Sequence, residues 1–267
     1  MSDFWELLRK GEQEFFESER PGFRHGTRFI AVSSIAEQYY CEYKLENEFA
    51  LGEIPTEAKS AGTVLHDELM PTERVSREQF ADLIARKEPS MAVLDVWGES
   101  GGLSVVGTPD HIIWSEGRPI WLMELKTTKG DPAPLWEDQE NQVRIYGLLL
   151  EKMGFDCSQM QLAVVRLKSG ELDDRQKKEW IVQISGALLE GKTKWLEVRY
   201  PGRMKVHILK HEPEKAEKAI ASKAGYWLGE REPRPSTSVG KCRACEYSPT
   251  CPKSLSGLLD RPGERIG

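Results

Sequence analysis

The sequence predicts a mixed α/β protein in which helices flank a mixed β-sheet. Residues 103–114 and 119–126 are rich in Val, Ile, Leu and Trp and are bounded by Gly and Pro, which is typical of strands. Residues 135–153 and 174–189 have the patterns of long helices. Because strands and helices mix along the chain without a regular alternation, we expect a mixed sheet.

The composition fits one large domain better than two small ones. The chain has 267 residues, of which 39% are hydrophobic and 30% charged. Its apolar runs are shorter than the roughly 20 residues of a membrane span, and its acidic start is not a signal peptide, so we expect a cytoplasmic protein with no membrane partner. The net charge of −6 argues against an architectural DNA-binding protein. Any nucleic-acid binding would depend on a local basic groove.

The remaining elements follow from local patterns. A capping box, with Ser33 or Ser34 as N-cap and Glu37 at its third position, predicts the start of a helix at about residues 35–49. Further helices are expected at residues 3–19, 62–70, 76–86 and 214–228, and a further strand at residues 162–168. Hairpins are expected between residues 91–97 and 103–114 and between residues 195–200 and 204–209.

Two carboxylates interrupt the apolar strands. Asp110 ends the run Val-Gly-Thr-Pro-Asp, and Glu124 lies within Trp-Leu-Met-Glu-Leu-Lys. An ionised carboxylate among buried strands is costly unless it is paired or bound to a metal. Lys126, two residues after Glu124, lies on the same face of the strand. Two converging carboxylates can bind Mg²⁺ or Mn²⁺, and a neighbouring lysine can orient and help deprotonate a water that attacks a phosphoryl group. Taken alone, Glu-x-Lys is more often part of a solvated face.

Other side chains are weaker candidates. His66 lies on the predicted helix 62–70, and a lone histidine is more often satisfied within the core. Gln142 and Tyr146 share a helix face after the Lys126 strand, where they could line a substrate groove; a surface amide and a packed tyrosine are the ordinary alternative. The candidates for phosphate contacts, each equally compatible with ordinary surface, are Lys129, Arg144, Arg166 and Lys168.

The cysteines indicate a second site. Cys242, Cys245 and Cys251 form C-x2-C-x5-C, which in a chain without a secretory signal is typical of a metal site. A fourth thiolate could come from Cys41 or Cys157. From spacing alone, Zn²⁺ is the metal ion most often bound by such cysteines, although the second C-x-x-C pair of a zinc ribbon is missing. Three unrelated buried thiols are the remaining alternative.

Four motifs occur in a fixed order: Gly-x-x-x-His ending at His66, Gly-x-Pro-Asp ending at Asp110, Glu-x-Lys ending at Lys126, and Gln-x-x-x-Tyr ending at Tyr146. This order resembles the RecB-like branch of the PD-(D/E)xK nucleases. One upstream cysteine plus C-x2-C-x5-C resembles the iron–sulfur subset of that branch, which includes the CRISPR-associated exonucleases. The resemblance covers about residues 33–252.

The resemblance implies a restriction-endonuclease-like fold that is effectively one domain. Residues 1–32 would form a helical extension and residues 33–232 the nuclease core, in which residues 33–70 contribute Cys41 and His66. Residues 233–267 would form the cysteine-cluster segment. The implied ligands of one or two Mn²⁺ or Mg²⁺ ions are His66, Asp110, Glu124 and the Leu125 carbonyl; Lys126 would act on the water, and Gln142 and Tyr146 would complete the groove. The implied ligands of a [4Fe–4S] cluster, with Zn²⁺ as the alternative occupant, are Cys41, Cys242, Cys245 and Cys251.

The implied activity is hydrolysis of single-stranded or frayed DNA ends. The stand-alone length of 267 residues favours a CRISPR-associated exonuclease of antiviral defence over a helicase-fused nuclease. Such an enzyme would trim spacer precursors together with integration proteins. Two alternatives stay open: a stand-alone exonuclease of DNA repair, and a non-catalytic iron–sulfur or zinc module that binds DNA.

Overall fold

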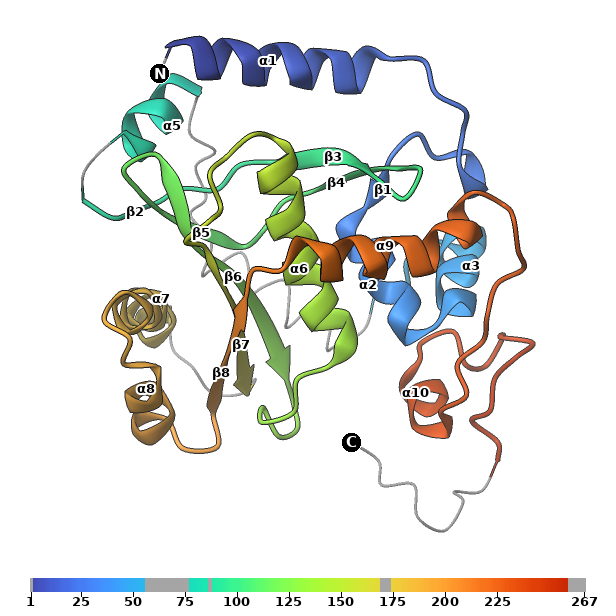
Figure 1. The fold of residues 1–267 in the computed structure, drawn as a ribbon. Coiled ribbons are helices and arrows are strands. Elements are labelled where there is room, and N and C mark those ends of the chain that lie inside the picture. Colours follow the sequence, from blue (N-terminus) through green and yellow to red (C-terminus); the bar gives the residue numbers. More distant parts are fainter. Residues whose placement is uncertain (1, 56–76, 86–87, 169–173, 259–267) are drawn as a thin grey trace.

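The structure, a computed structural model, describes residues 2–55, 77–85, 88–168 and 174–258, which form two β-sheets with surrounding helices (Figure 1). The larger sheet has the strand order β2 (Ser90–Met91), β5 (His111–Ser115), β6 (Arg118–Thr128), β7 (Gln161–Lys168) and β8 (Met204–Lys210). Strands β6 and β7 are parallel, and the other neighbours are antiparallel. The smaller sheet has the order β1 (Ile30–Ala31), β4 (Leu103–Gly107) and β3 (Val96–Ser100). The predicted mixed sheet with flanking helices is confirmed.

Helices cover both faces of the larger sheet. α6 (Glu137–Lys152) packs on one face, and α7 (Asp174–Leu189) and α8 (Thr193–Arg199) pack on the other. Successive residues of a strand point to opposite faces, so Val164 belongs to the core under α6 and Val165 to the core under α7. Burial from both sides explains why β6 and β7 are nearly continuous apolar runs.

The remaining helices enclose the α6 side and the smaller sheet. Their bounds are α1 (Ser2–Glu17), the 3₁₀ turn η1 (Arg24–Gly26), α2 (Val32–Tyr40), α3 (Glu42–Leu51), α5 (Arg77–Ile84), α9 (Pro213–Trp227) and α10 (Val239–Ala244). α2 and α9 both pack against α6. α1 lies along β3, where the rings of Phe15 and Trp97 are 5.1 Å apart. No helix in the described ranges is both long and apolar enough to cross a membrane.

Most predicted elements occur close to their expected ends. The helices predicted at residues 3–19, 76–86, 135–153, 174–189 and 214–228 correspond to α1, α5, α6, α7 and α9, and the strand at residues 162–168 corresponds to β7. The hairpin of β3 and β4 turns through Gly101 and Gly102, whose φ angles of 59° and 76° favour glycine. The helix predicted at residues 62–70, which would carry His66, lies outside the described residues.

The single helix predicted at residues 35–49 is wrong, because Cys41 divides it. The chain enters α2 directly from β1, whose Ala31 pairs with Val106, so the helix begins before Ser33 and Ser34. Ala31 is the N-cap and makes no side-chain capping bond. Cys41 has an extended backbone and both ends α2 and begins α3. The capping box therefore located the helix but misplaced its first residue and missed its interruption.

Three strand predictions also differ from the structure. Residues 91–97 are divided between β2, in the larger sheet, and β3, in the smaller one. Residues 103–114 form two strands in different sheets, because the chain changes direction at Thr108, Pro109 and Asp110. Residues 195–200 belong largely to helix α8 rather than to a strand paired with β8. Leu196 is the buried residue of α8, packed under α7, whereas Trp195 and Val198 are exposed. Strand propensity depends on packing, and here a helix provides the packing.

Candidate active site

Asp110 and Glu124 are brought together by the antiparallel pairing of β5 with β6. His111 pairs with Met123, which places Asp110 beside Glu124 at the start of β5. The Leu125 backbone N–H donates a 2.7 Å hydrogen bond to Asp110 Oδ2. Asp110 is 5% exposed and Glu124 is 2% exposed. The hairpin therefore holds two carboxylates in the interior, where such groups are costly without a cationic partner.

A polar chain leads from Glu124 to helix α6. The Lys126 ammonium lies 2.8 Å from Glu124 Oε1 and donates a second hydrogen bond of 2.8 Å to Gln142 Oε1. The Gln142 amide in turn donates to the Tyr146 hydroxyl at 3.4 Å. Gln142 and Tyr146 are one helical turn apart, so α6 holds both against the strand. The structure thus brings together Asp110, Glu124, Lys126, Gln142 and Tyr146.

Gly107 allows α6 to approach this closely. A Cβ atom at Gly107 would lie 2.7 Å from Cε1 of the Tyr146 ring and 3.1 Å from Cγ2 of Val32. Both distances are shorter than ordinary carbon–carbon contacts, so a larger residue would push the tyrosine away. The glycine of Gly-x-Pro-Asp therefore leaves room for the tyrosine of Gln-x-x-x-Tyr.

Opposing electrostatic effects set the charge of Lys126. Burial lowers the pKa of Lys126, but the charges of Glu124 and Asp110 and the bond to Glu124 together raise it above its ordinary value. Lys126 is therefore an ammonium at neutral pH and acts as a donor. Burial and the same two carboxylates raise the pKa of Tyr146, so its hydroxyl stays neutral. Lys126 in this state can orient a water or a phosphate oxygen but cannot accept a proton.

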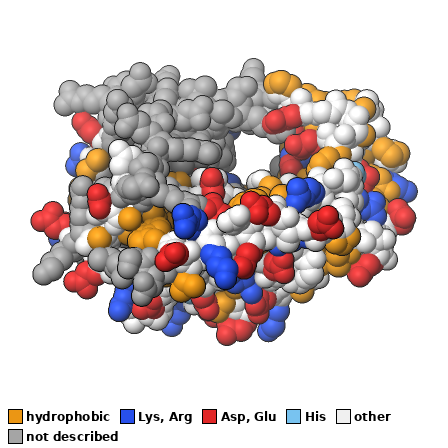
Figure 2. Space-filling view, turned by 90° about the horizontal axis from the view of Figure 1, so that it is seen from above, with side chains coloured by type: hydrophobic (Ala, Val, Ile, Leu, Met, Phe, Trp, Pro, Cys, Tyr) orange, Lys and Arg blue, Asp and Glu red, His pale blue; other side chains and the backbone are white. Residues whose placement is uncertain are grey.

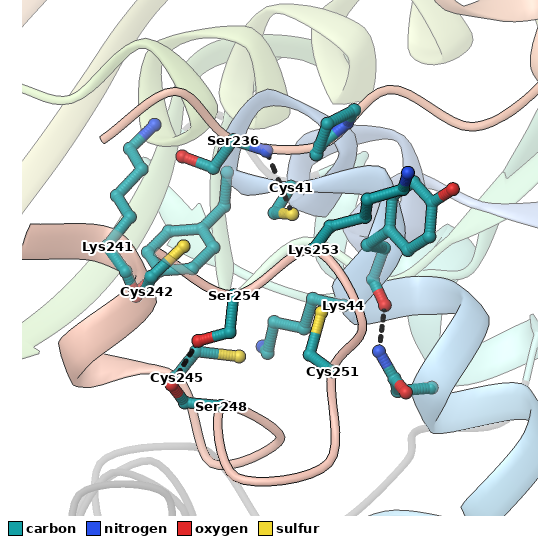
Figure 3. A pocket seen from close by; sticks show the side chains of 14 residues that line it. Cys41, Lys44, Ser236, Lys241, Cys242, Cys245, Ser248, Cys251, Lys253 and Ser254 are labelled. Carbon is teal, nitrogen blue, oxygen red and sulfur yellow. Dashed lines mark hydrogen bonds between the residues drawn. The ribbon is translucent and has the colours of Figure 1, made fainter. Parts of the chain in front are cut away.

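Four of the five cysteines line one cavity. Cys41, at the junction of α2 and α3, faces Cys242, Cys245 and Cys251 of the C-terminal segment across an open space (Figure 3). The Ser236 backbone N–H donates a 3.3 Å hydrogen bond to Cys41 Sγ. Cys157 lies elsewhere in the core, where burial raises the pKa of its thiol to about 12. The fold separates Cys157 from the other four.

The segments that line the cavity are held together by hydrogen bonds that do not involve the thiols. Glu42 is 2% exposed and accepts hydrogen bonds of 2.6 Å from both Nη1 and Nη2 of Arg231. The Arg234 backbone N–H adds a third bond to Glu42 at 2.7 Å. Tyr40 donates to the Lys241 carbonyl at 2.6 Å, and Tyr247 donates to the Gly52 carbonyl at 2.7 Å. These bonds join α2 and α3 to the C-terminal segment.

The model of the PD-(D/E)XK nuclease superfamily matches residues 35–252. The chain belongs to this superfamily. The match includes both carboxylates and the four cavity cysteines. No curated protein matches the chain. Among solved structures, the crystal structure of SSO0001 is similar, with a TM-score of 0.45 and 14% identity over 93% of this chain and 96% of that one.

Membership of the PD-(D/E)XK superfamily implies a metal-dependent nuclease that acts on DNA, and the site has donors that suit a divalent cation. Asp110 and Glu124 offer buried carboxylate oxygens, and with Lys126 they carry more negative than positive charge. Within the described ranges no group of three or more His, Cys, Asp or Glu side chains is placed to hold one metal ion. His66, the predicted third ligand, lies outside these ranges.

Sequence reasoning missed two groups near the site. His111 follows Asp110 and is fully buried at the start of β5. Asp138, in the first turn of α6, adds to the negative potential at Lys126. The position of His111 beside Asp110 was a usable signal. Asp138 carried none, because its proximity depends on how α6 packs.

The four basic candidates divide into two classes. Arg144 is 4% exposed and uses its guanidinium to bind Glu140, Glu212 and the Lys210 carbonyl, contacts that account for its burial without a nucleic acid. Arg166 is 3% exposed and donates to the Pro134 carbonyl. Lys129 and Lys168 are exposed at the ends of β6 and β7. Acidic and basic side chains are intermingled on the face seen in Figure 2.

Proposed function

We propose that this PD-(D/E)XK nuclease is a Mg²⁺- or Mn²⁺-dependent exonuclease that hydrolyses single-stranded or frayed DNA ends. The observation that supports this activity best is the convergence of Asp110 and Glu124 with Lys126 in one buried site. Water attack on a phosphodiester requires that negative charge be neutralised and that the water be oriented. The site contains groups suited to both tasks.

Each residue has a distinct role in this proposal. Asp110 and Glu124 would hold the cation, with His66 and the Leu125 carbonyl proposed as further ligands. The bound cation would lower the pKa of the attacking water and stabilise charge on the phosphoryl oxygen. Lys126 orients the water and the scissile phosphate through its ammonium. Gln142 fixes the position of Lys126, and Tyr146 fixes Gln142.

Nucleotide release from end-labelled single-stranded DNA tests the activity. Wild-type protein with Mn²⁺ should shorten the strand, while Asp110→Asn and Glu124→Gln should leave it intact. Glu217→Ala is a matched control, because Glu217 is an exposed carboxylate that pairs only with Lys152 at 3.3 Å in the described structure. Equal cleavage by all variants, or none by the wild type, would reject the proposal. Binding of DNA without cleavage would instead support the non-catalytic module.

We also propose that Cys41, Cys242, Cys245 and Cys251 ligate a [4Fe–4S] cluster. Each iron of such a cluster takes one thiolate, so its four ligands lie farther apart than the four ligands of a single Zn²⁺. Four thiols that surround one cavity suit a group larger than a single ion. The Ser236 N–H bond to Cys41 Sγ is of the kind that stabilises a cluster thiolate.

An anaerobic purification with an absorbance spectrum and assays for iron and sulfide tests the cluster. We expect broad absorbance near about 400 nm, lost in Cys242→Ala and retained in Cys157→Ala. A colourless protein that contains one zinc would reject the cluster and support Zn²⁺.

The cellular role that we propose is trimming of CRISPR spacer precursors beside integration proteins. It is supported by the combination of the Asp110–Tyr146 motifs with the four-cysteine cavity. Overhang-bearing duplexes trimmed to a defined length when integration proteins are added would support this role. Unlimited digestion, unchanged by those proteins, would support a repair exonuclease.

A further inference from the structure

The N-terminal end of α6 carries an exposed tryptophan close to the catalytic lysine. Lys126 on β6 pairs with Arg166 on β7 in a parallel register, so their side chains project from the same face of the sheet. That face is the one under α6, because Lys126 bonds Gln142. The Arg166 guanidinium carbon lies 5.9 Å from the centre of the Trp136 ring. Trp136 is therefore separated from Lys126 by one side chain.

Arg166 holds this tryptophan from beneath. It donates to the Pro134 carbonyl, two residues before Trp136, and is 3% exposed. Among the described residues its Nε–H has no acceptor, so the guanidinium is not fully used within the protein. Trp136 itself is 37% exposed and directly precedes the first turn of α6. An indole held on one side by a buried cation offers its outer surface to solvent.

A basic side chain extends the same row. Lys168 lies two residues after Arg166 at the end of β7, on the same strand face, and is exposed. An aromatic platform beside a lysine is the combination by which proteins bind single strands, because every base has a face that can stack. In a duplex the faces of the bases are occupied by their neighbours.

We propose that Trp136 stacks on an unpaired base of the DNA strand entering the active site, with Arg166 as its positioning residue and Lys168 contacting a phosphate. This inference rests on the proposed nuclease function and names the feature that makes it select unpaired DNA. It also reassigns Arg166 from phosphate contact to support of the platform.

The test compares Trp136→Ala with Trp195→Ala. Trp195, on α8 at the opposite face of the sheet, is a matched control because it is 48% exposed and also has an arginine, Arg199, 5.2 Å from its ring centre. Binding of a labelled single strand is measured by fluorescence anisotropy in EDTA, and KM and kcat are measured with Mn²⁺. Trp136→Phe and thermal melting show whether loss of binding reflects loss of folding.

We expect Trp136→Ala to raise Kd and KM about tenfold with little change in kcat. Trp136→Phe should recover most of the binding, and Trp195→Ala should match the wild type. An abasic site at one position of the strand should weaken wild-type binding by the same factor as Trp136→Ala does on an intact strand. The same abasic site should not weaken binding by Trp136→Ala any further. A Kd that is unchanged in Trp136→Ala would overturn the proposal. So would an abasic site that weakens binding by Trp136→Ala as much as it weakens binding by the wild type. A wild type that binds strands in this way but does not cleave them would reject the nuclease function alone.

Discussion

The carboxylate site and the cysteine cavity are built in opposite ways. Asp110, Glu124, Lys126, Gln142 and Tyr146 come from one hairpin and the helix that follows β6, so short-range structure is enough to bring them together. The cavity joins Cys41 to a segment at the other end of the chain and forms only when the whole domain has closed. Changes in the first region should therefore affect chemistry, and changes in the second should affect stability.

The largest expected effect is on catalysis. Glu124→Gln removes one carboxylate charge beside Lys126, and we expect cleavage to fall at least about 1,000-fold, as when one member of a catalytic unit is lost. The melting temperature should stay close to that of the wild type, because the substitution preserves size and the amide can still bond Lys126. If Glu124→Gln lost much stability but kept part of its activity, the assignment of chemistry to the carboxylate site and of stability to the cysteine cavity would be contradicted.

The next effect is on stability through the cysteines. Cys41→Ala should lower the melting temperature by about 5–10 °C and abolish iron binding, because binding of a structural metal group contributes to folding. The variant of the buried thiol outside the cavity, Cys157→Ala, should retain its iron. Equal melting temperatures for Cys41→Ala and the wild type would show that the cysteine cavity does not stabilise the folded domain.

The ion pair beside the cavity provides a test without metal. Burial raises the pKa of Glu42, but the bonds from Arg231 and Arg234 outweigh it and hold the pKa below its ordinary value of 4.5. Arg231→Ala leaves this carboxylate buried without its cationic partner, which should cost about 3–5 kcal/mol in the free energy of unfolding. Lys192→Ala, which breaks the exposed pair with Glu190, should leave the free energy of unfolding close to that of the wild type. Denaturant unfolding measures both.

The same pair predicts a pH dependence. Because the pKa of Glu42 is lower in the folded state, its contribution is fully present above pH 4.5 and is lost as the pH falls through the folded value. The stability gap between the wild type and Glu42→Gln should therefore narrow below pH 4.5. A gap that stays constant to lower pH would show that the Glu42 charge does not stabilise the fold.

A smaller effect is expected at Gly107, where β4 contacts helix α6. Gly107→Ala places a methyl group against Tyr146 and should destabilise the protein by about 1–3 kcal/mol. Activity should fall with it, because Tyr146 holds Gln142. Gly186→Ala is a suitable control, since apart from its chain neighbours and the nearby backbone of its own helix no atom in the described structure lies within 4 Å of its Cβ position. Equal stability of the two variants would remove the role assigned to Gly107.

The sequence predicted the local site better than its surroundings. The pairing of Asp110 with Glu124 and the shared face of Gln142 and Tyr146 followed from strand and helix periods. The interruption at Cys41, the helical state of Trp195, and the burial of Arg144 and Arg166 depend on contacts between distant segments, which no local pattern encodes. Arg166 and Lys129 looked alike as basic residues, yet one is enclosed beneath Trp136 and the other is exposed.

The most direct test of the carboxylate site is a calorimetric titration with Mn²⁺ of the anaerobically purified wild type and of Asp110→Asn/Glu124→Gln. We predict saturable binding to the wild type that the double variant lacks, while both proteins have the same melting curve and iron content. Equal Mn²⁺ binding by the two proteins would place the metal elsewhere and contradict the assignment of Asp110 and Glu124 as its ligands.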